Sequence, residues 1–134
     1  MVEVKLHRVA VDPQNNQAIL LLRDEGGRRV LPLIVGALEA SSIALAVENI
    51  PRRRPLTHDL IISLLETFGA SLKSVLIDDV RDDTFFAQLT LAVGDEEKEI
   101  DARPSDAIAL AARTGAPIYA LEKVLLLAGV SEEE

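Results

Sequence analysis

Apolar and polar residues alternate along the first third of the chain, with the period of two that is typical of strands packed on one face. The alternation runs over residues 2–11, where it shifts near Arg8, and returns over 18–24 and 28–34. The turn-forming runs "DPQNNQ" and "DEGG" separate these segments, so we expect two consecutive hairpins. Pro32 removes a backbone donor, which predicts that its nitrogen faces away from a partner strand.

Helical spacing replaces the alternation from residue 36 onward. It covers residues 36–50, where small residues on the apolar face would let another element approach closely. It also covers residues 103–117, with Pro104 at the first helical position and Gly115 just past the end. Both residues are ordinary signals for the start and stop of a helix.

Another helix is predicted over residues 56–69, after the break "PRRRP". Thr57 is its expected N-cap and Gly69 its C-terminal stop. The predicted buried stripe consists of Leu60, Ile61, Leu64, Leu65 and Phe68.

The remaining segments complete the fold class. We expect an antiparallel meander from strands at 71–78 and 84–93 and a short strand ending at Asp101, then a strand at 118–120 and a last helical piece at 121–129. Strands in blocks, separated by helices, favour an α+β fold over an alternating parallel one. The sequence therefore predicts a single compact domain over residues 1–130, with a mostly antiparallel sheet, three main helices and a frayed acidic tail at 131–134.

Composition narrows the class of protein. The 134 residues, 49% of them hydrophobic, suffice for one domain with a real core. The absence of cysteine excludes disulfides and thiolate chemistry. We find no signal peptide or spanning segment and expect a cytoplasmic protein without membrane contact. A net charge of -8 opposes nonspecific binding to nucleic acid, so any such contact must be local, and Arg52, Arg53 and Arg54 are the expected anion-binding surface.

Familiar catalytic signatures are missing from the chain, including a phosphate-binding loop and a nucleophile elbow. "Ser105-Asp106" and "Thr57-His58-Asp59" suggest a hydrolase at first sight. Adjacent residues do not make a triad, however, because its members meet through the fold. We therefore disfavour a serine hydrolase.

Two polar clusters lie at predicted helix starts. A neutral His58 in the first turn of its helix could ligate a metal or accept a proton; alternatively, Thr57 caps, Asp59 complements the helix dipole and His58 is simply exposed. Asp106 could reach back to the backbone of Arg103 in a capping box. Capping does not explain why Asp101 and Arg103 flank this position. The guanidinium of Arg103 could bind either an aspartate or a substrate phosphate.

Four segments in this order carry a family resemblance: "VLPLIVGALEASSIALAVE", "RPLTHDLIISLLETFGA", "DDTFFAQLTL" and "DARPSDAIALAARTGAPIY". Together, from about Val30 to Tyr119, they resemble the bacterial bifunctional nuclease family. The resemblance implies a compact, self-associating α+β domain with nuclease activity on DNA and RNA. The matching positions are Gly36, Glu39, Arg54, Pro55, Leu56, Thr57, His58, Asp59, Asp101, Arg103, Pro104, Ser105, Asp106 and Ala107.

A nuclease hypothesis follows from the resemblance and the chemistry. The expected catalytic residues are His58, Asp59, Asp106 and Glu39, and the expected substrate-binding residues are Arg54, Thr57, Arg103 and Ser105. Asp59, Asp101 and Asp106 would hold Mg²⁺ or Mn²⁺, which activates water and stabilises phosphoryl charge. The hypothesis requires that the two motif helices bring their N-terminal ends together.

The alternative is a noncatalytic interaction domain in which the same residues form a structural network and apolar faces bind another copy or a regulatory partner. The acidic net charge suits this alternative. A nuclease should cluster unpaired carboxylates in a basic-rimmed cleft. An interaction domain should satisfy Asp59 and Asp106 by caps and salt bridges and expose an apolar patch instead. The resemblance makes nuclease the leading hypothesis.

Overall fold

The alternating segments form one eight-stranded sheet in the computed structural model, which describes residues 1–131. The strands are β1 (Val2–Asp12), β2 (Gln17–Asp24), β3 (Arg29–Gly36), β4 (Ala70–Arg81), β5 (Thr84–Val93), β6 (Glu96–Ala102), β7 (Ile118–Ala120) and β8 (Val130–Ser131). The helices of the described residues are α1 (Ala37–Val47), α2 (Thr57–Thr67), α3 (Pro104–Thr114) and α4 (Glu122–Ala128). The α+β class is confirmed, with four helices where three main ones were predicted.

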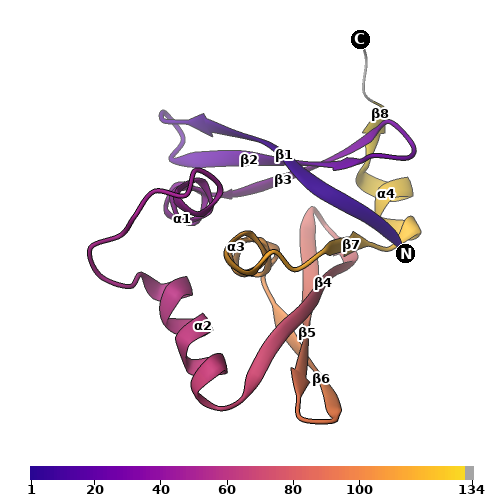
Figure 1. Cartoon of the computed structure of the whole chain (residues 1–134). Coiled ribbons are helices and arrows are strands. Elements are labelled where there is room, and N and C mark those ends of the chain that lie inside the picture. Colours follow the sequence, from indigo (N-terminus) through magenta and orange to yellow (C-terminus); the bar gives the residue numbers. More distant parts are fainter. Residues whose placement is uncertain (132–134) are drawn as a thin grey trace.

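The sheet is mostly antiparallel and has the strand order β6-β5-β4-β7-β1-β2-β3-β8. Short β7 joins the two halves of this sheet, since it pairs antiparallel with β1 and parallel with β4. The two halves approach α1 and α3 from different sides (Figure 1). The register shift predicted near Arg8 is present between Leu6 and Arg8.

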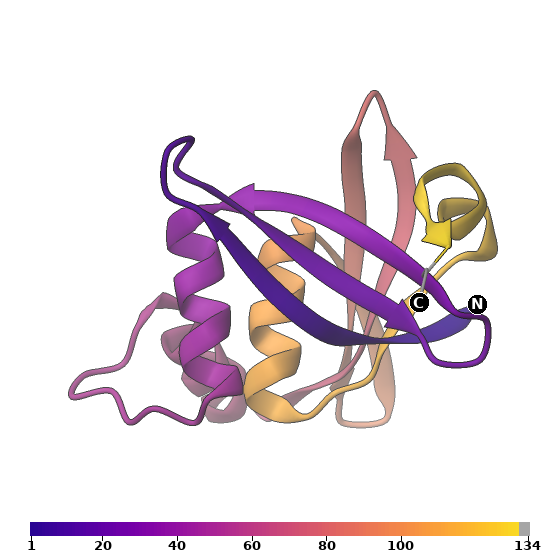
Figure 2. The same cartoon turned by 90° about the horizontal axis from the view of Figure 1, so that it is seen from above.

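Helices α1 and α3 lie side by side within the curve of the sheet (Figure 2). Small side chains make this close packing possible, because Ala40 of α1 and Ala107 and Ala111 of α3 are buried. Gly115 ends α3 in the left-handed conformation, with φ of 78°, and its N–H donates to the carbonyl of Ala111. A residue with a Cβ would be strained there, so the predicted stop signal is confirmed.

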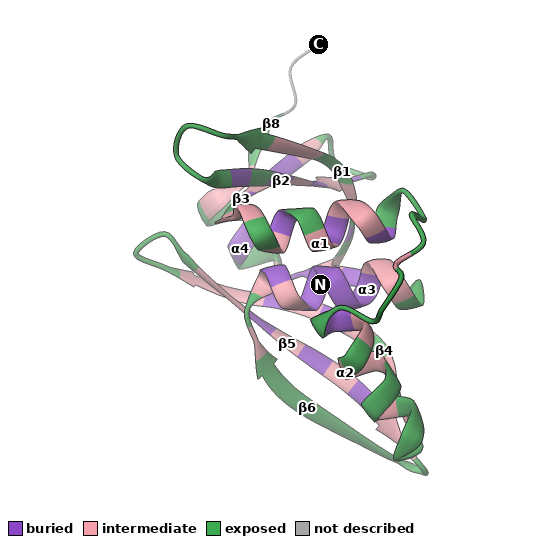
Figure 3. Ribbon diagram, turned by 90° about the vertical axis from the view of Figure 1, so that its left-hand side faces the viewer, coloured by how far each residue is buried: buried purple, intermediate pink, exposed green. Residues whose placement is uncertain are grey.

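Helix α2 differs from the prediction. Ile61, Ile62 and Leu65 pack against the core, whereas Leu64 and Phe68 are 51% and 78% exposed. The predicted buried stripe is therefore wrong in three of its members, Leu60, Leu64 and Phe68. Apolar residues occupy a wide arc of this helix, so periodicity alone cannot tell which part of the arc meets α3 and β4. Figure 3 shows the contrast between largely exposed α2 and largely buried α3.

The ends of the described chain carry two further findings. Ser131, which the sequence assigns to the acidic tail, pairs with Arg29 as part of β8; the rest of that predicted tail, residues 132–134, lies outside the described residues. Within residues 1–131, no helix has the length and apolar character needed to cross a lipid bilayer.

The orientation of α2 can be tested with two leucines of different burial. Leu110 of α3 is 2% exposed, so Leu110→Ala should lower the free energy of unfolding by about 3 kcal/mol through lost burial and a cavity. Leu64→Ala should lower it by less than about 1 kcal/mol, because half of that side chain already meets water. Urea denaturation measures both values. Equal losses would contradict this placement of α2.

Candidate functional site

His58 lies in the first turn of α2 and is buried, with 7% of its surface exposed. Its helix begins at Thr57, and Leu56 is the N-cap, one residue earlier than predicted. Asp59, the third helical residue, accepts a hydrogen bond from the backbone N–H of Leu56 at 2.9 Å, as the acidic member of a capping box does. Thr57 is therefore inside the helix and is not its N-cap, and the alternative of an exposed His58 is wrong.

Both ring nitrogens of His58 have side-chain partners on other helices. Nε2 lies 2.9 Å from Oδ1 of Asp106, at the start of α3, and Nδ1 lies 2.8 Å from Oγ of Ser42, on α1. An ionised carboxylate only accepts hydrogen bonds, so Nε2 donates to Asp106. In the neutral ring Nδ1 is then the acceptor for the serine hydroxyl. The N-terminal ends of α2 and α3 therefore meet, as the nuclease hypothesis requires.

Asp106 binds the guanidinium of Arg103, so of the alternatives left open by the sequence the salt bridge is confirmed in place of the capping box. Its carboxylate accepts two hydrogen bonds from the guanidinium of Arg103, at 2.8 and 3.1 Å, in addition to the bond from His58. Burial raises the pKa of Asp106, but the hydrogen bonds and charges of Arg103 and His58 outweigh burial and hold that pKa below its ordinary value. Asp106 is accordingly an anion at neutral pH.

An open hollow of about 420 Å³ lies over this group of residues. We call it the histidine cleft; the polar residues of its lining that concern the argument are Glu39, Ser42, Thr57, His58, Arg103 and Asp106. Five of these six are predicted site residues, which three separate helix starts bring to one place. The cleft could admit a small polar group such as a phosphate next to His58.

Glu39 reaches this cleft from the third position of α1. Its Oε1 lies 3.5 Å from Nη1 of Arg103, and its carboxylate folds back over the start of its own helix. A Cβ on Gly36 would lie only 2.5 Å from Oε2 of Glu39, so the glycine leaves room for this carboxylate. Glu39 is thus a partner of Arg103 rather than a solvated helix residue.

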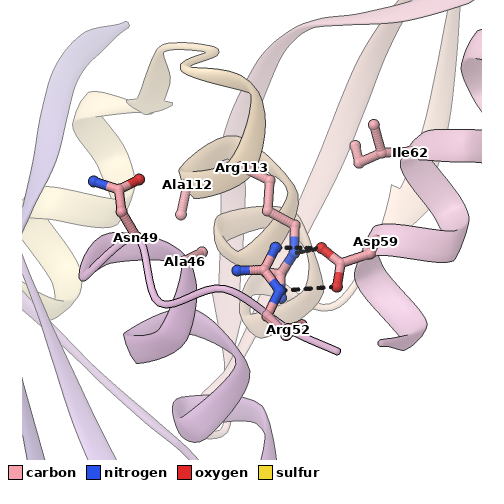
Figure 4. A pocket seen from close by; sticks show the side chains of 7 residues that line it. All are labelled: Ala46, Asn49, Arg52, Asp59, Ile62, Ala112 and Arg113. Atoms are coloured by element: carbon pink, nitrogen blue, oxygen red, sulfur yellow. Dashed lines mark hydrogen bonds and ion pairs between the residues drawn. The ribbon is translucent and has the colours of Figure 1, made fainter. Parts of the chain in front are cut away.

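Asp59 does not line the histidine cleft and points toward two arginines (Figure 4). Its Oδ1 accepts from Arg52 at 2.6 Å and from Arg113 at 2.8 Å. These groups line a second hollow of about 240 Å³, the arginine hollow, together with Ala46, Asn49, Ile62 and Ala112. The hydrogen bond from Arg52 holds the pKa of Asp59 far below its usual range; burial opposes this shift, and Leu56 N–H and Arg113 reinforce it.

The other predicted residues lie around these two hollows. Arg54 is exposed and borders a further hollow that it shares with Arg52 and Asp59. Ser105 is buried and faces a separate hollow beside Arg103. Asp101 is exposed on β6, opposite Gln88 of β5, outside the lining of the histidine cleft.

The predicted metal set of Asp59, Asp101 and Asp106 is not brought together by this arrangement. Arginines neutralise Asp59 and Asp106, and Asp101 stands apart on β6. Among residues 1–131, no group of three or more His, Asp or Glu side chains is placed to hold a metal ion. The donor set does not fit a resident Mg²⁺ or Mn²⁺, since such sites need free carboxylate oxygens.

Ser42 and Arg113 are the site residues that the sequence analysis missed. Nη2 of Arg113 donates to Oγ of Ser42 at 3.0 Å, and the Arg113 side chain is only 5% exposed. Arg113 is a basic residue in the last turn of a helix whose other residues are mostly small and apolar. This pattern is only a weak indication that Arg113 belongs to a site. Nothing in the local pattern around Ser42 distinguishes it from Ser41, because its partners come from other helices.

Comparison with known proteins gives the family of the chain. Residues 20–133 match the sequence profile described as "Bifunctional nuclease domain". The chain belongs to this family. An uncharacterized protein of Mycobacterium tuberculosis (strain ATCC 25618 / H37Rv) is 45% identical over 130 residues, which are 97% of this chain and 77% of that protein.

Plant proteins with the bifunctional nuclease domain are more distant. Bifunctional nuclease 1 of Oryza sativa subsp. japonica is 31% identical over 116 residues, and bifunctional nuclease 2 of Arabidopsis thaliana is 30% identical over 106 residues. These matches cover 84% and 77% of the chain but only 35% and 32% of the plant proteins. The chain thus spans about a third of the plant relatives, and the family match includes every residue of both hollows.

Asp59 should act chiefly on stability. Asp59→Asn would leave buried Arg113 without its charged partner, and we expect the free energy of unfolding at pH 7 to fall by about 2 kcal/mol. Because the folded state lowers the pKa of Asp59, its contribution is complete above the unfolded pKa of about 4 and is lost as the pH falls through the folded pKa. Urea denaturation from pH 7 to pH 2 should show wild type and variant converging in acid. A constant gap would contradict this role.

Proposed function

We propose that this bifunctional nuclease domain hydrolyses phosphodiester bonds in DNA or RNA, with the histidine cleft as its active site. The observation that carries the proposal is the position of His58, buried between Asp106 and Ser42 at the base of an open cleft. Family membership supports this reaction class, since the plant relatives are named bifunctional nucleases.

The chemistry of the cleft follows from the hydrogen bonds of His58. Asp106 accepts from Nε2–H, which orients the ring and stabilises the imidazolium that forms when Nδ1 takes a proton. Nδ1 faces Ser42 and the cleft and is the general base. General acid–base catalysis of this kind contributes about 10²- to 10⁴-fold in rate.

Phosphate binding would be local, as the net charge of -8 requires. Arg103 is 65% exposed at the cleft, and its Nη1, which lies 3.5 Å from Glu39, can bind a phosphate while Nε and Nη2 stay bonded to Asp106. Arg53 and Arg54 are exposed in the loop before α2, and no ion pair of theirs is present among the described residues. Together with the hydroxyl of Thr57, these guanidinium groups are the proposed substrate-binding set.

No step of this proposal passes through a metal ion, because the carboxylates near the cleft are engaged by arginine and histidine. By the criterion set from the sequence, the pairing of Asp59 and Asp106 with arginines favours the interaction domain over a nuclease that uses unpaired carboxylates. Acid–base chemistry at His58 does not need free carboxylates, so this pairing is compatible with the proposal.

The proposal is tested by cleavage of labelled single-stranded DNA, duplex DNA and RNA in Mg²⁺, Mn²⁺ or EDTA. Removing the base in His58→Ala should lower the cleavage rate at least about 100-fold. His7→Ala is the matched control, since His7 is exposed on β1 and should leave the rate unchanged. Equal rates for His58→Ala and wild type, with the variant shown to be folded, would contradict the proposal, and activity that depends strictly on Mg²⁺ or Mn²⁺ would contradict its metal-free form.

A second candidate function is a noncatalytic domain that associates with another copy of itself. The observation that favours it is the row Leu56, Leu60, Leu64 and Phe68 along α2, spaced by four residues and exposed by 37% to 78%. A contiguous apolar row on a helix is typical of a protein interface, and two copies of one row can pack about a two-fold axis.

Self-association through this row predicts a concentration-dependent mass above that of the 14.5 kDa chain. Leu64→Asp should shift the protein to a monomer, because a charge would be buried in the interface. Val11→Asp, at a 62% exposed position of β1, is the control and should not change the mass. Light scattering coupled to gel filtration measures all three. A wild-type monomer at every concentration would rule out this candidate.

A further inference from the structure

We infer that Ser42 is the nucleophile of the phosphodiester hydrolysis and that the reaction passes through a covalent phosphoserine. The inference rests on the proposed function and names the atom that attacks phosphorus. It goes beyond the role of His58 as a base, which would serve an attacking water molecule equally well.

The order of hydrogen bonds around Ser42 is that of an activated serine. Arg113 Nη2 donates to Oγ at 3.0 Å, so the guanidinium takes one acceptor position of the hydroxyl oxygen. The hydroxyl hydrogen is left to point at Nδ1 of His58, 2.8 Å away. The other ring nitrogen donates to Asp106 at 2.9 Å, which completes a serine–histidine–aspartate sequence.

The three members come from three helices, as the triad geometry demands. Ser42 lies on α1, His58 on α2 and Asp106 on α3, and 16 and 48 positions separate the bonded pairs in the chain. Adjacent Ser105 and Asp106 do not form a triad, which is why the sequence disfavours a serine hydrolase. The fold supplies a different serine, from a segment where no catalytic motif is visible.

Access and charge distinguish this arrangement from a purely structural network. Ser42 and His58 both line the histidine cleft, so a phosphorus atom in the cleft could reach Oγ. Arg113 is held in place by Asp59 and by the carbonyl oxygen of Ala109. Its guanidinium would stabilise the negative charge that develops on Oγ as the proton leaves.

In the first half of the reaction, Oγ of Ser42 attacks phosphorus and its proton moves to Nδ1 of His58. The bond between phosphorus and the leaving oxygen breaks on the opposite side. The leaving oxygen takes a proton that a water molecule relays from the imidazolium of His58, and it departs as an alcohol. The products of this half are a phosphoserine diester, the alcohol and a neutral His58.

In the second half, a water molecule attacks phosphorus from the side that the alcohol has left, and its proton is relayed to Nδ1 of His58. The bond between phosphorus and Oγ breaks, and Ser42 recovers its proton from the imidazolium of His58. The sum is one phosphodiester and one water converted to a phosphate monoester and an alcohol. Two inversions at phosphorus leave its configuration retained.

A fluorophosphonate probe tests the nucleophile independently of any nucleic acid, because it phosphonylates activated serines with loss of fluoride. We expect mass spectrometry to find the probe on Ser42 in wild type, and labelling to fall at least 50-fold in Ser42→Ala and His58→Ala. Ser41→Ala is the matched control. Ser41 lines the same cleft but bonds the carbonyl of Ala37 in its own helix, so the control should label as wild type does.

Cleavage of labelled oligonucleotides by the same four proteins completes the test. Loss of at least 100-fold in Ser42→Ala, with Ser41→Ala unchanged, supports the inference. Cleavage by wild type that persists in folded Ser42→Ala overturns the inference and leaves the proposed function standing. Labelling of Ser42 without cleavage of any nucleic acid overturns the proposed function, while the activated serine is retained. Cleavage by wild type without labelling of Ser42 also overturns the inference.

Discussion

The relative positions of helices α1, α2 and α3 depend on the hydrogen bonds of one buried histidine. His58 is almost enclosed, and each ring nitrogen meets a partner from a different helix, Ser42 on α1 and Asp106 on α3. A buried polar group left without its hydrogen bond costs about 1–3 kcal/mol, so the ring holds the start of α2 against the start of α3 and the middle of α1. The same two bonds make the imidazole a directed base instead of a freely rotating side chain.

Acidic residues at equivalent positions organise the surroundings of that histidine. Glu39, Asp59 and Asp106 are each the third residue of their helix, where a carboxylate complements the helix dipole. Each also binds an arginine: Arg103 for Glu39 and Asp106, and Arg52 and Arg113 for Asp59. A protein with a strongly acidic net charge thereby keeps guanidinium groups beside its cleft, which makes a local phosphate site compatible with the overall charge.

Much of this fold follows from local patterns in the sequence. The alternation of apolar and polar residues predicts the strands, including the irregularity near Arg8, and Gly115 predicts the end of α3. Both predictions succeed because these features depend on neighbours in the chain. The buried side of α2 does not follow, since Leu60 and Leu64 are as apolar as Leu65 and only the contact with α3 and β4 separates them. In the site, the family motifs lead to His58, Asp106 and Arg103. Ser42 and Arg113 could not be predicted, because their roles arise from partners 16 to 71 positions away.

The most direct test of this account is the tautomer of His58, measured by nitrogen NMR on protein labelled at histidine. The chain has two histidines. In His7→Gln, His58 is therefore the one histidine that gives signals in the spectrum. The account predicts a proton on Nε2, an unprotonated Nδ1 that accepts from Ser42, and a change at Nδ1 in Ser42→Ala. A proton on Nδ1, or signals that do not respond to Ser42→Ala, would contradict it.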